Sequence, residues 1–155
     1  MPGALCAIGE MVKGSCLCGT VVYEIDRLNG PILHCHCTTC CKAHAGAFAS
    51  TAGVGREHFR WTKGEEKLSF YESSPGKRRY FCSVCDSHLV ASRDTQAHVI
   101  LRVATLDEDP HAGSQAHIWA SQDVPWLKYG EAVPSYSAVP PSTSGEVHVP
   151  RKIED

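Results

Sequence analysis

Cysteine placement constrains this chain more than any other feature of its sequence. Eight of the nine cysteines fall in three tight clusters: Cys16-Leu17-Cys18, Cys35-His36-Cys37-Thr38-Thr39-Cys40-Cys41 and Cys82-Ser83-Val84-Cys85. Cysteines in small proteins serve mainly in disulfides or as metal ligands, and a disulfide framework tends to spread its cysteines along the chain. The clustering therefore favours metal binding.

The N-terminal segment agrees with this interpretation because it lacks the features of a secretory signal. Met1–Gly14 has no basic start, and Glu10 interrupts its short apolar stretch. We therefore expect a cytoplasmic protein in a reducing compartment, where thiols stay free to bind metal. No run of 18 apolar residues occurs, so the sequence predicts no membrane-spanning helix.

The chain of 155 residues is long enough for one domain with a real core. Short stretches rich in β-branched and aromatic residues alternate with turn residues, which is typical of an all-β domain. The expected strands are Thr20–Ile25, His58–Thr62, Lys67–Ser73, Arg78–Cys82, His88–Arg93, His98–Leu106, His117–Ser121 and Trp126–Lys128. Ala43–Ser50 begins as a short helix or runs straight into a strand.

Domain boundaries follow from composition. We expect a loose leader at 1–13, a zinc-binding domain at 14–133 and an extended or disordered tail at 134–155, where prolines and serines accumulate. The net charge of −2 gives no basic field for nucleic acid. The sequence gives no indication of the oligomeric state.

The first and third clusters suit one structural metal site. Cys82 and Cys85 have the spacing that points two sulfurs into a single tetrahedral centre. Cys16 and Cys18 face the same side of an extended backbone, and Gly19 permits a sharp bend after them. Together these four thiolates would close the coordination sphere of one zinc ion, which is typical of a structural site.

The middle cluster suits a different kind of site. Cys35, Cys37 and Cys40 can wrap one metal within a single short loop. Three protein ligands leave a fourth position for water or a substrate atom, as a catalytic zinc requires. A zinc ion with three thiolates holds a further thiol in its deprotonated form near neutral pH, so this site favours chemistry on a small thiol.

Two alternatives to the open site remain at this stage. A fourth protein ligand would close it, and the candidates are Cys41, His34, His36 and His44. The three cysteines could instead act as redox thiols without metal. His36 or His44 could also move a proton during a reaction on the thiol.

The three clusters, in this order, resemble the glutathione-dependent formaldehyde-activating enzyme family, which also includes centromere protein V. The matching stretches are Gly14–Val21, Cys35–Gly46 and Phe81–Cys85, and Ala116–Trp119 with Val124–Leu127 resembles the family's final strand region. The resemblance implies a β-tent of stacked antiparallel sheets. It also implies two zinc ions, a structural one on Cys16, Cys18, Cys82 and Cys85 and a catalytic one on Cys35, Cys37 and Cys40.

The implied activity is that of a carbon–sulfur lyase, which joins glutathione and formaldehyde into S-hydroxymethylglutathione. Two positions depart from the family: Cys41 replaces the usual arginine, and Asp86 replaces the glycine that usually follows the last pair. The alternative function is a non-catalytic, zinc-stabilised interaction module. A basic patch would favour the module, and the net charge of −2 therefore favours the enzyme.

Two features outside the clusters bear on a substrate. The basic run Lys77-Arg78-Arg79 is either a solvated strand edge or a clamp for substrate carboxylates, which glutathione carries. His117, near Trp119 and Trp126, is expected to be a packed, hydrogen-bonded histidine rather than a base.

Overall fold

The computed structural model describes residues 10–127 and Ser137. The chain divides into two compact units, Met1–Val124 and Pro125–Asp155, and every helix and strand below belongs to the first. The strands are β1 (Val12–Ser15), β2 (Val22–Ile25), β3 (Ile32–Cys35), β4 (Ala49–Gly55), β5 (Phe59–Lys63), β6 (Leu68–Ser74), β7 (Lys77–Cys82), β8 (His88–Arg93), β9 (His98–Arg102) and β10 (Ser114–Ile118). The helices are α1 (Thr38–His44) and four single turns, η1 (Arg56–His58), η2 (Glu65–Lys67), η3 (Val103–Thr105) and η4 (Ala120–Gln122).

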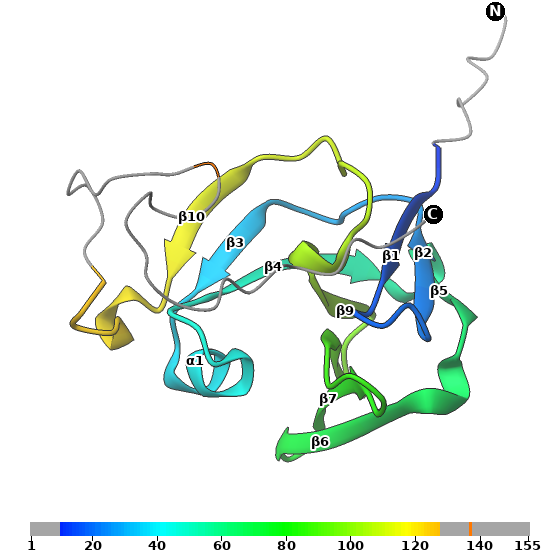
Figure 1. Cartoon of the computed structure of the whole chain (residues 1–155). Coiled ribbons are helices and arrows are strands. Elements are labelled where there is room, and N and C mark those ends of the chain that lie inside the picture. The colour runs from blue at the N-terminus through cyan, green and yellow to red at the C-terminus, as the bar shows by residue number, and fades with distance from the viewer. Residues whose placement is uncertain (1–9, 128–136, 138–155) are drawn as a thin grey trace, which may run out of the picture. The chain divides into compact units, whose positions relative to one another are not determined.

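The strands form two sheets, as expected for an all-β fold. One sheet has three strands in the order β1-β2-β5, and the other has seven in the order β10-β3-β4-β9-β8-β7-β6. Neighbouring strands run antiparallel except β10, which pairs with β3 in parallel at the edge of the larger sheet. Figure 1 shows α1 below the β3–β10 end of this sheet, facing β6 and β7.

The hydrophobic core joins the two sheets. In β2 the side chains alternate, so that Tyr23 and Ile25 are fully buried while Val22 and Glu24 are only partly covered. Tyr23 stacks on Phe59 of β5 with ring centroids 5.2 Å apart. The same buried cluster includes Leu89, Val90, Val99 and Leu101 from the larger sheet. Burial of this apolar surface is the main force that holds the sheets together.

Several expected strands lie within a residue or two of the observed ones, whereas β1 and β3 were not expected and β10 begins three residues before its expected range His117–Ser121. β8 matches its expected range, whereas β9 ends at Arg102 because η3 turns the chain there. β1, β3 and β4 are short or rich in small residues and carry little β-branched signal. The stretch 43–50 resolves into the end of α1 and the start of β4. Trp126 and Leu127 are not in a strand.

Most of the predicted leader and tail lies outside the described residues, so those boundaries stay predictions. β1 begins at Val12, two residues before the expected start of the domain. None of the helices in the described part of the chain is long and apolar enough to cross a membrane.

Candidate metal centres

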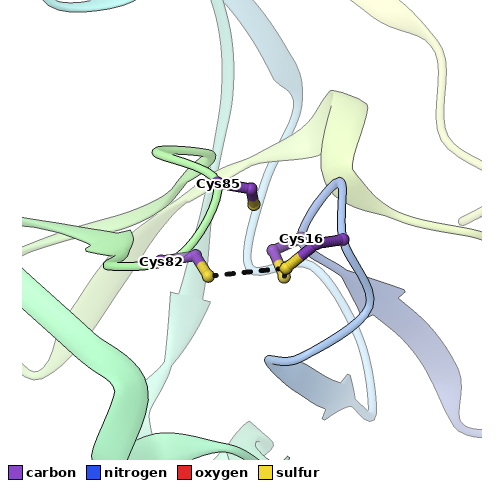
Figure 2. A group of neighbouring side chains, drawn as sticks. Cys16, Cys82 and Cys85 are labelled. Carbon is purple, nitrogen blue, oxygen red and sulfur yellow. Dashed lines mark hydrogen bonds between the residues drawn. The ribbon is translucent and has the colours of Figure 1, made fainter.

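The structure brings the first and third cysteine clusters together from distant parts of the chain. The sulfur atoms of Cys16, Cys18, Cys82 and Cys85 all lie within 4.8 Å of one another. Figure 2 shows Cys82 and Cys85 directed toward Cys16 from the opposite loop. Cys16 and Cys82 are buried, whereas Cys18 is exposed. The cluster thus links the end of β1 to the end of β7.

Backbone hydrogen bonds hold both loops of this cluster in shape. The Cys16 loop closes through a bond from the Gly19 N–H to the Cys16 carbonyl, and Gly19 has the positive φ of 75° that its position was expected to need. In the other loop the Asp86 N–H donates to the Cys82 carbonyl at 2.9 Å. Asp86 has a φ of 62°, a left-handed conformation that glycine adopts without strain.

The distances within this cluster fit a tetrahedral metal site. Cys16 Sγ lies 3.6 Å from Cys18 Sγ, and Cys18 Sγ lies 3.9 Å from Cys82 Sγ. Zinc–sulfur bonds of 2.3 Å in a tetrahedron place sulfurs roughly 3.8 Å apart. Backbone N–H groups also donate to two of the sulfurs. The Val21 N–H donates to Cys16 Sγ at 3.2 Å, and the Val84 N–H donates to Cys82 Sγ at 3.4 Å. Such donors stabilise thiolate over thiol.

The thiol pKa values of this cluster diverge. Burial raises the pKa of Cys16 to about 11. Burial acts in the same direction on Cys85, but hydrogen bonds from Ser87 and Cys18 outweigh it and lower the pKa to about 6. One thiolate therefore forms readily near neutral pH, while full deprotonation needs a cation among the sulfurs. The four residues fit a closed metal site.

The middle cluster forms where β3 ends and α1 begins. The sulfurs of Cys35, Cys37 and Cys40 lie within 4.8 Å of one another. Cys37 caps α1, and its sulfur accepts a hydrogen bond from the Cys40 N–H at 3.4 Å. Ala45 ends the helix in a left-handed conformation. One tight turn thus gathers three sulfurs, of which Cys35 and Cys40 are buried.

Candidate fourth ligands point away from these sulfurs. The Cys41 thiol donates to the backbone carbonyls of Ala47 at 3.3 Å and His36 at 3.5 Å. His36 is fully buried, with Nδ1 2.8 Å from Asp123 Oδ1 and Nε2 2.7 Å from His117 Nδ1. Within the described part of the chain, the group that could hold a metal here comprises the three cysteines alone.

His34 and His44, the other two candidate fourth ligands, make contacts elsewhere. His34 contacts the hydroxyls of Ser50 and Ser114. His44 packs against His88 with ring centroids 4.8 Å apart. Burial, reinforced by the charge of Arg102, lowers the pKa of His44 to about 3, so this imidazole is neutral at ordinary pH. His44 is therefore a poor carrier for a proton during a reaction.

Two buried arginines accompany the middle cluster, and sequence reasoning placed neither of them there. Arg79 is 3% exposed, and its Nη1 donates toward Cys40 Sγ at 4.0 Å while its Nε donates to Ser73 at 2.9 Å. Arg102, at the end of β9, is 6% exposed. Charged side chains this deeply buried are rare unless paired, and the pairing partner here is thiolate charge. Burial lowers the pKa of Arg102, and the charge of Cys40, Cys35 and Cys37 partly offsets this effect.

The thiols of the middle cluster also fit a cation. Burial raises the pKa of Cys35 to about 12. Burial also acts to raise the pKa of Cys37. The Cys40 N–H, the neighbouring thiols and the charge of Arg79 outweigh it, so the pKa of Cys37 is lowered. Three thiolates side by side would repel one another without a metal ion, and two guanidiniums alone would not balance their three charges. A divalent cation more than offsets the negative charge that remains.

Residues of α1 line two cavities. The Arg102 cavity, of about 540 Å³, is lined by Ala43, His44, Ala45, Phe48, Ala49, Ser50, Asp86, Ser87, His88, Arg102, Ala104 and Thr105. The Arg79 cavity, of about 380 Å³, is lined by Thr39, Lys42, Ala43, Tyr71, Ser73, Arg79, Phe81 and His88. Both volumes are in the range of small-molecule sites. Each cavity is lined by an arginine that interacts with cysteines of the middle cluster.

A histidine pair lies at the β3–β10 edge. His117 is hydrogen-bonded as expected, but it is exposed rather than packed in the core. Its ring contacts His34 and Phe48, with centroids 5.0 Å and 5.8 Å apart. Asp123 Oδ1 lies 2.8 Å from His36 Nδ1. The sequence did not predict this contact, because it depends on η4 folding back onto the cysteine loop.

Comparison with known proteins finds a solved structure and a family model that match this chain. A protein from Rhodobacter sphaeroides of known crystal structure is 26% identical to this chain and superposes with a TM-score of 0.57. The match covers 68% of this chain and 98% of that one. The family model described as glutathione-dependent formaldehyde-activating enzyme matches residues 11–122, which include all three cysteine clusters. The chain therefore belongs to the glutathione-dependent formaldehyde-activating enzyme family.

Proposed function

We propose that the protein is a zinc-dependent carbon–sulfur lyase acting on a small thiol and an aldehyde of the formaldehyde type. Membership of the family supports a reaction that involves glutathione and formaldehyde. The observation that carries the proposal is the middle cluster, where three sulfurs converge and the nearest further thiol, Cys41, donates to backbone carbonyls instead. A fourth position is thereby left for a substrate sulfur.

The two clusters take different roles in this proposal. Cys16, Cys18, Cys82 and Cys85 would hold a structural zinc whose four ligands are all protein thiolates. Cys35, Cys37 and Cys40 would hold a catalytic zinc. When bound there, zinc supplies a position that keeps a substrate thiol deprotonated at neutral pH.

The chemistry needs one new bond and one proton. The substrate sulfur donates an electron pair to the aldehyde carbon, the carbon–oxygen double bond becomes a single bond, and the oxygen takes up the proton that the thiol released. The reverse reaction cleaves the same carbon–sulfur bond. The protein's own part is to orient the thiol, to exclude water and to stabilise negative charge on sulfur.

Arg79 and the helix turn supply that stabilisation. The Arg79 guanidinium faces Cys40, and the Cys40 N–H points at the Cys37 sulfur. Both groups reduce the charge density on the cysteine sulfurs, so that an additional thiolate is repelled less. They are fixed by their own packing, since Arg79 is buried and bonded to Ser73.

NMR with ¹³C-formaldehyde tests the proposal. It measures the rate at which glutathione and formaldehyde interconvert with S-hydroxymethylglutathione. We expect the zinc-loaded protein to accelerate the exchange above its spontaneous rate. Cys37→Ser should abolish the acceleration, whereas Cys41→Ser should retain it. Equal rates with and without the wild-type protein would contradict the proposal.

A further inference from the structure

Cys37 is the residue of the middle cluster that lies in no strand or helix. Cys35 ends β3, which is paired with β4 on one side and with β10 on the other. Cys40 lies within α1 and is buried. Cys37 lies between these two elements, at the position that caps the helix. The place of its sulfur therefore depends on contacts from other parts of the chain.

The segment that follows β10, which includes η4, supplies such contacts on both sides of Cys37. On one side, His36 Nδ1 lies 2.8 Å from Asp123 Oδ1. On the other side, the N–H and the hydroxyl of Thr38 both donate to Gln122 Oε1, at 2.9 Å and 3.2 Å. Gln122 is the last residue of η4, and Asp123 follows it. Two adjacent residues of one segment thus contact the two neighbours of Cys37.

The contact between Asp123 and His36 is the better protected of the two. The His36 side chain is fully buried, and that of Asp123 is 32% exposed. An ionised carboxylate only accepts hydrogen bonds, so Nδ1 of the ring is the donor here. Nε2 of the same ring lies 2.7 Å from His117 Nδ1. A buried ring with contacts at both nitrogens is held in one orientation, and it restrains the backbone between Cys35 and Cys37.

A second histidine–aspartate pair provides a comparison for this contact. His58 Nδ1 lies 3.0 Å from Asp26 Oδ2, and the Asp26 side chain is 39% exposed. The two pairs are therefore alike in geometry and in the exposure of the carboxylate. They differ in what flanks the histidine, because only His36 stands between two clustered cysteines in the sequence. Loss of the Asp123 carboxylate would leave a buried donor beside Cys37 without its acceptor, which favours a shift of the ring or the loop.

We propose that Asp123 and Gln122 are positioning residues for the middle cluster. Asp123 orients the ring of His36, Gln122 holds the backbone of Thr38, and together they keep the Cys37 sulfur where all three sulfurs can share one metal ion. Neither residue touches the metal or the substrate in this account. The inference rests on the proposed function, because the metal held by the middle cluster is the one that would bind the substrate thiol.

The test is a competition for zinc between the full-length protein and a chromophoric chelator, which measures the zinc affinity of each cluster. We expect Asp123→Ala to weaken zinc binding at the middle cluster roughly tenfold to a hundredfold, as for loss of an outer partner of a metal site. The zinc affinity of the four-cysteine cluster should stay at its wild-type value. Cys37→Ser, which lacks one ligand, identifies which of the two affinities belongs to the middle cluster.

Three further variants separate positioning from a general effect on folding. In Asp123→Asn the amide oxygen can still accept from His36 Nδ1, so this variant should keep most of the zinc affinity. Gln122→Met removes the acceptor of Thr38 but leaves no buried ring nitrogen unpaired, so it should weaken binding less than Asp123→Ala. Asp26→Ala is the matched control, because it removes the similar contact to a histidine and should bind zinc as the wild type does. Circular dichroism checks that each variant is folded.

The outcomes separate this inference from the function on which it rests. Wild-type affinity at the middle cluster in Asp123→Ala would overturn the positioning role, and Gln122→Met decides in the same way if Asp123→Ala does not fold. Equal weakening of both clusters, or an Asp123→Asn variant as weak as Asp123→Ala, would also overturn it. If the wild type binds zinc at the middle cluster but does not accelerate the exchange of glutathione and formaldehyde, the proposed function fails and the positioning role stands.

Discussion

Cys41 adjoins the three clustered cysteines in sequence but differs from them in what its sulfur does. Its thiol donates to two backbone carbonyls, and a serine hydroxyl can make the same bonds. We expect Cys41→Ser to retain the full metal content of the wild type, whereas Cys40→Ser should lose one metal per chain. Elemental analysis of the purified proteins checks this. Loss of a metal from Cys41→Ser would mean that Cys41 is a ligand.

Arg79 stabilises thiolate charge from a buried position beside Cys40. Removal of a group that supports metal ligands typically weakens metal affinity by roughly tenfold to a hundredfold. We expect Arg79→Met to weaken zinc binding at Cys35, Cys37 and Cys40 by about that factor. The first site should be unaffected, because Arg79 does not contact it.

Competition with a chromophoric chelator measures the two zinc affinities separately. Arg60→Met, which alters an arginine with a side chain that is 57% exposed, provides the control. Unchanged affinity of the weaker site in Arg79→Met would show that the guanidinium does not support the thiolates.

Among the elements, the turns at Gly64 and Gly76 offer a matched pair. Both residues have a left-handed backbone, with φ of 72° and 75°. A methyl group on Gly64 would overlap the Thr20 carbonyl, whereas one on Gly76 would meet nothing within 4 Å. Gly76→Ala should therefore cost about 1–2 kcal/mol of unfolding free energy from the backbone alone. Gly64→Ala should cost clearly more, because the backbone at Thr20 must also move.

Urea denaturation of both variants measures this difference. The comparison isolates the steric contribution, because the conformational cost is common to the two positions. Equal destabilisation would mean that the Thr20 segment moves at little cost, and that the contact between the residues before β2 and the β5–β6 turn is looser than the structure indicates.

Local sequence signals predicted some elements well and others poorly. β2 and β8 carry β-branched and apolar residues in patterns that identify strands. β4 reads Ala-Ser-Thr-Ala-Gly-Val-Gly, and its small residues have low strand propensity. It is a strand because it is paired on both sides, by β3 and β9, so tertiary context determined its conformation. The parallel pairing of β10 with β3 is likewise a long-range contact without a local signal.

For the whole molecule, the cluster of Cys16, Cys18, Cys82 and Cys85 brings distant segments of the chain together. It joins β1 to the end of β7, and Cys82 is fully buried in the core. Structural zinc binding contributes on the order of 10 kcal/mol to folding in small zinc peptides, which is comparable to the total stability of a domain. Cys82→Ser should therefore prevent folding.

Cys37→Ser, in contrast, should leave a folded protein. The middle cluster closes a loop of only a few residues, so less chain entropy depends on it. Thermal melts and circular dichroism of the two variants test the distinction. Equal destabilisation by Cys82→Ser and Cys37→Ser would contradict the proposal that one site is structural and the other catalytic.

The cysteine clusters were visible in the sequence because spacing alone brings two or three sulfurs to one side of a short loop. The buried arginines were not. Arg79 belongs to a basic run that the sequence left as either a solvated strand edge or a clamp for substrate carboxylates, because sequence does not reveal that its strand is an inner one in the seven-stranded sheet. Arg102 ends β9 facing α1, a contact between segments about 60 residues apart. Residues that act on a site from other elements require the fold to be known.

The open coordination position at Cys35, Cys37 and Cys40 is the central claim, and the cobalt-substituted protein tests it most directly. Glutathione should shift the cobalt absorption bands toward a four-thiolate environment and release about one proton per thiol bound, because the metal takes the thiolate form. Oxidised glutathione, which has no free thiol, should leave the spectrum unchanged. If the reduced and oxidised forms act alike, or if Cys41→Ala abolishes the starting spectrum, the metal at Cys35, Cys37 and Cys40 has no open position for a thiol.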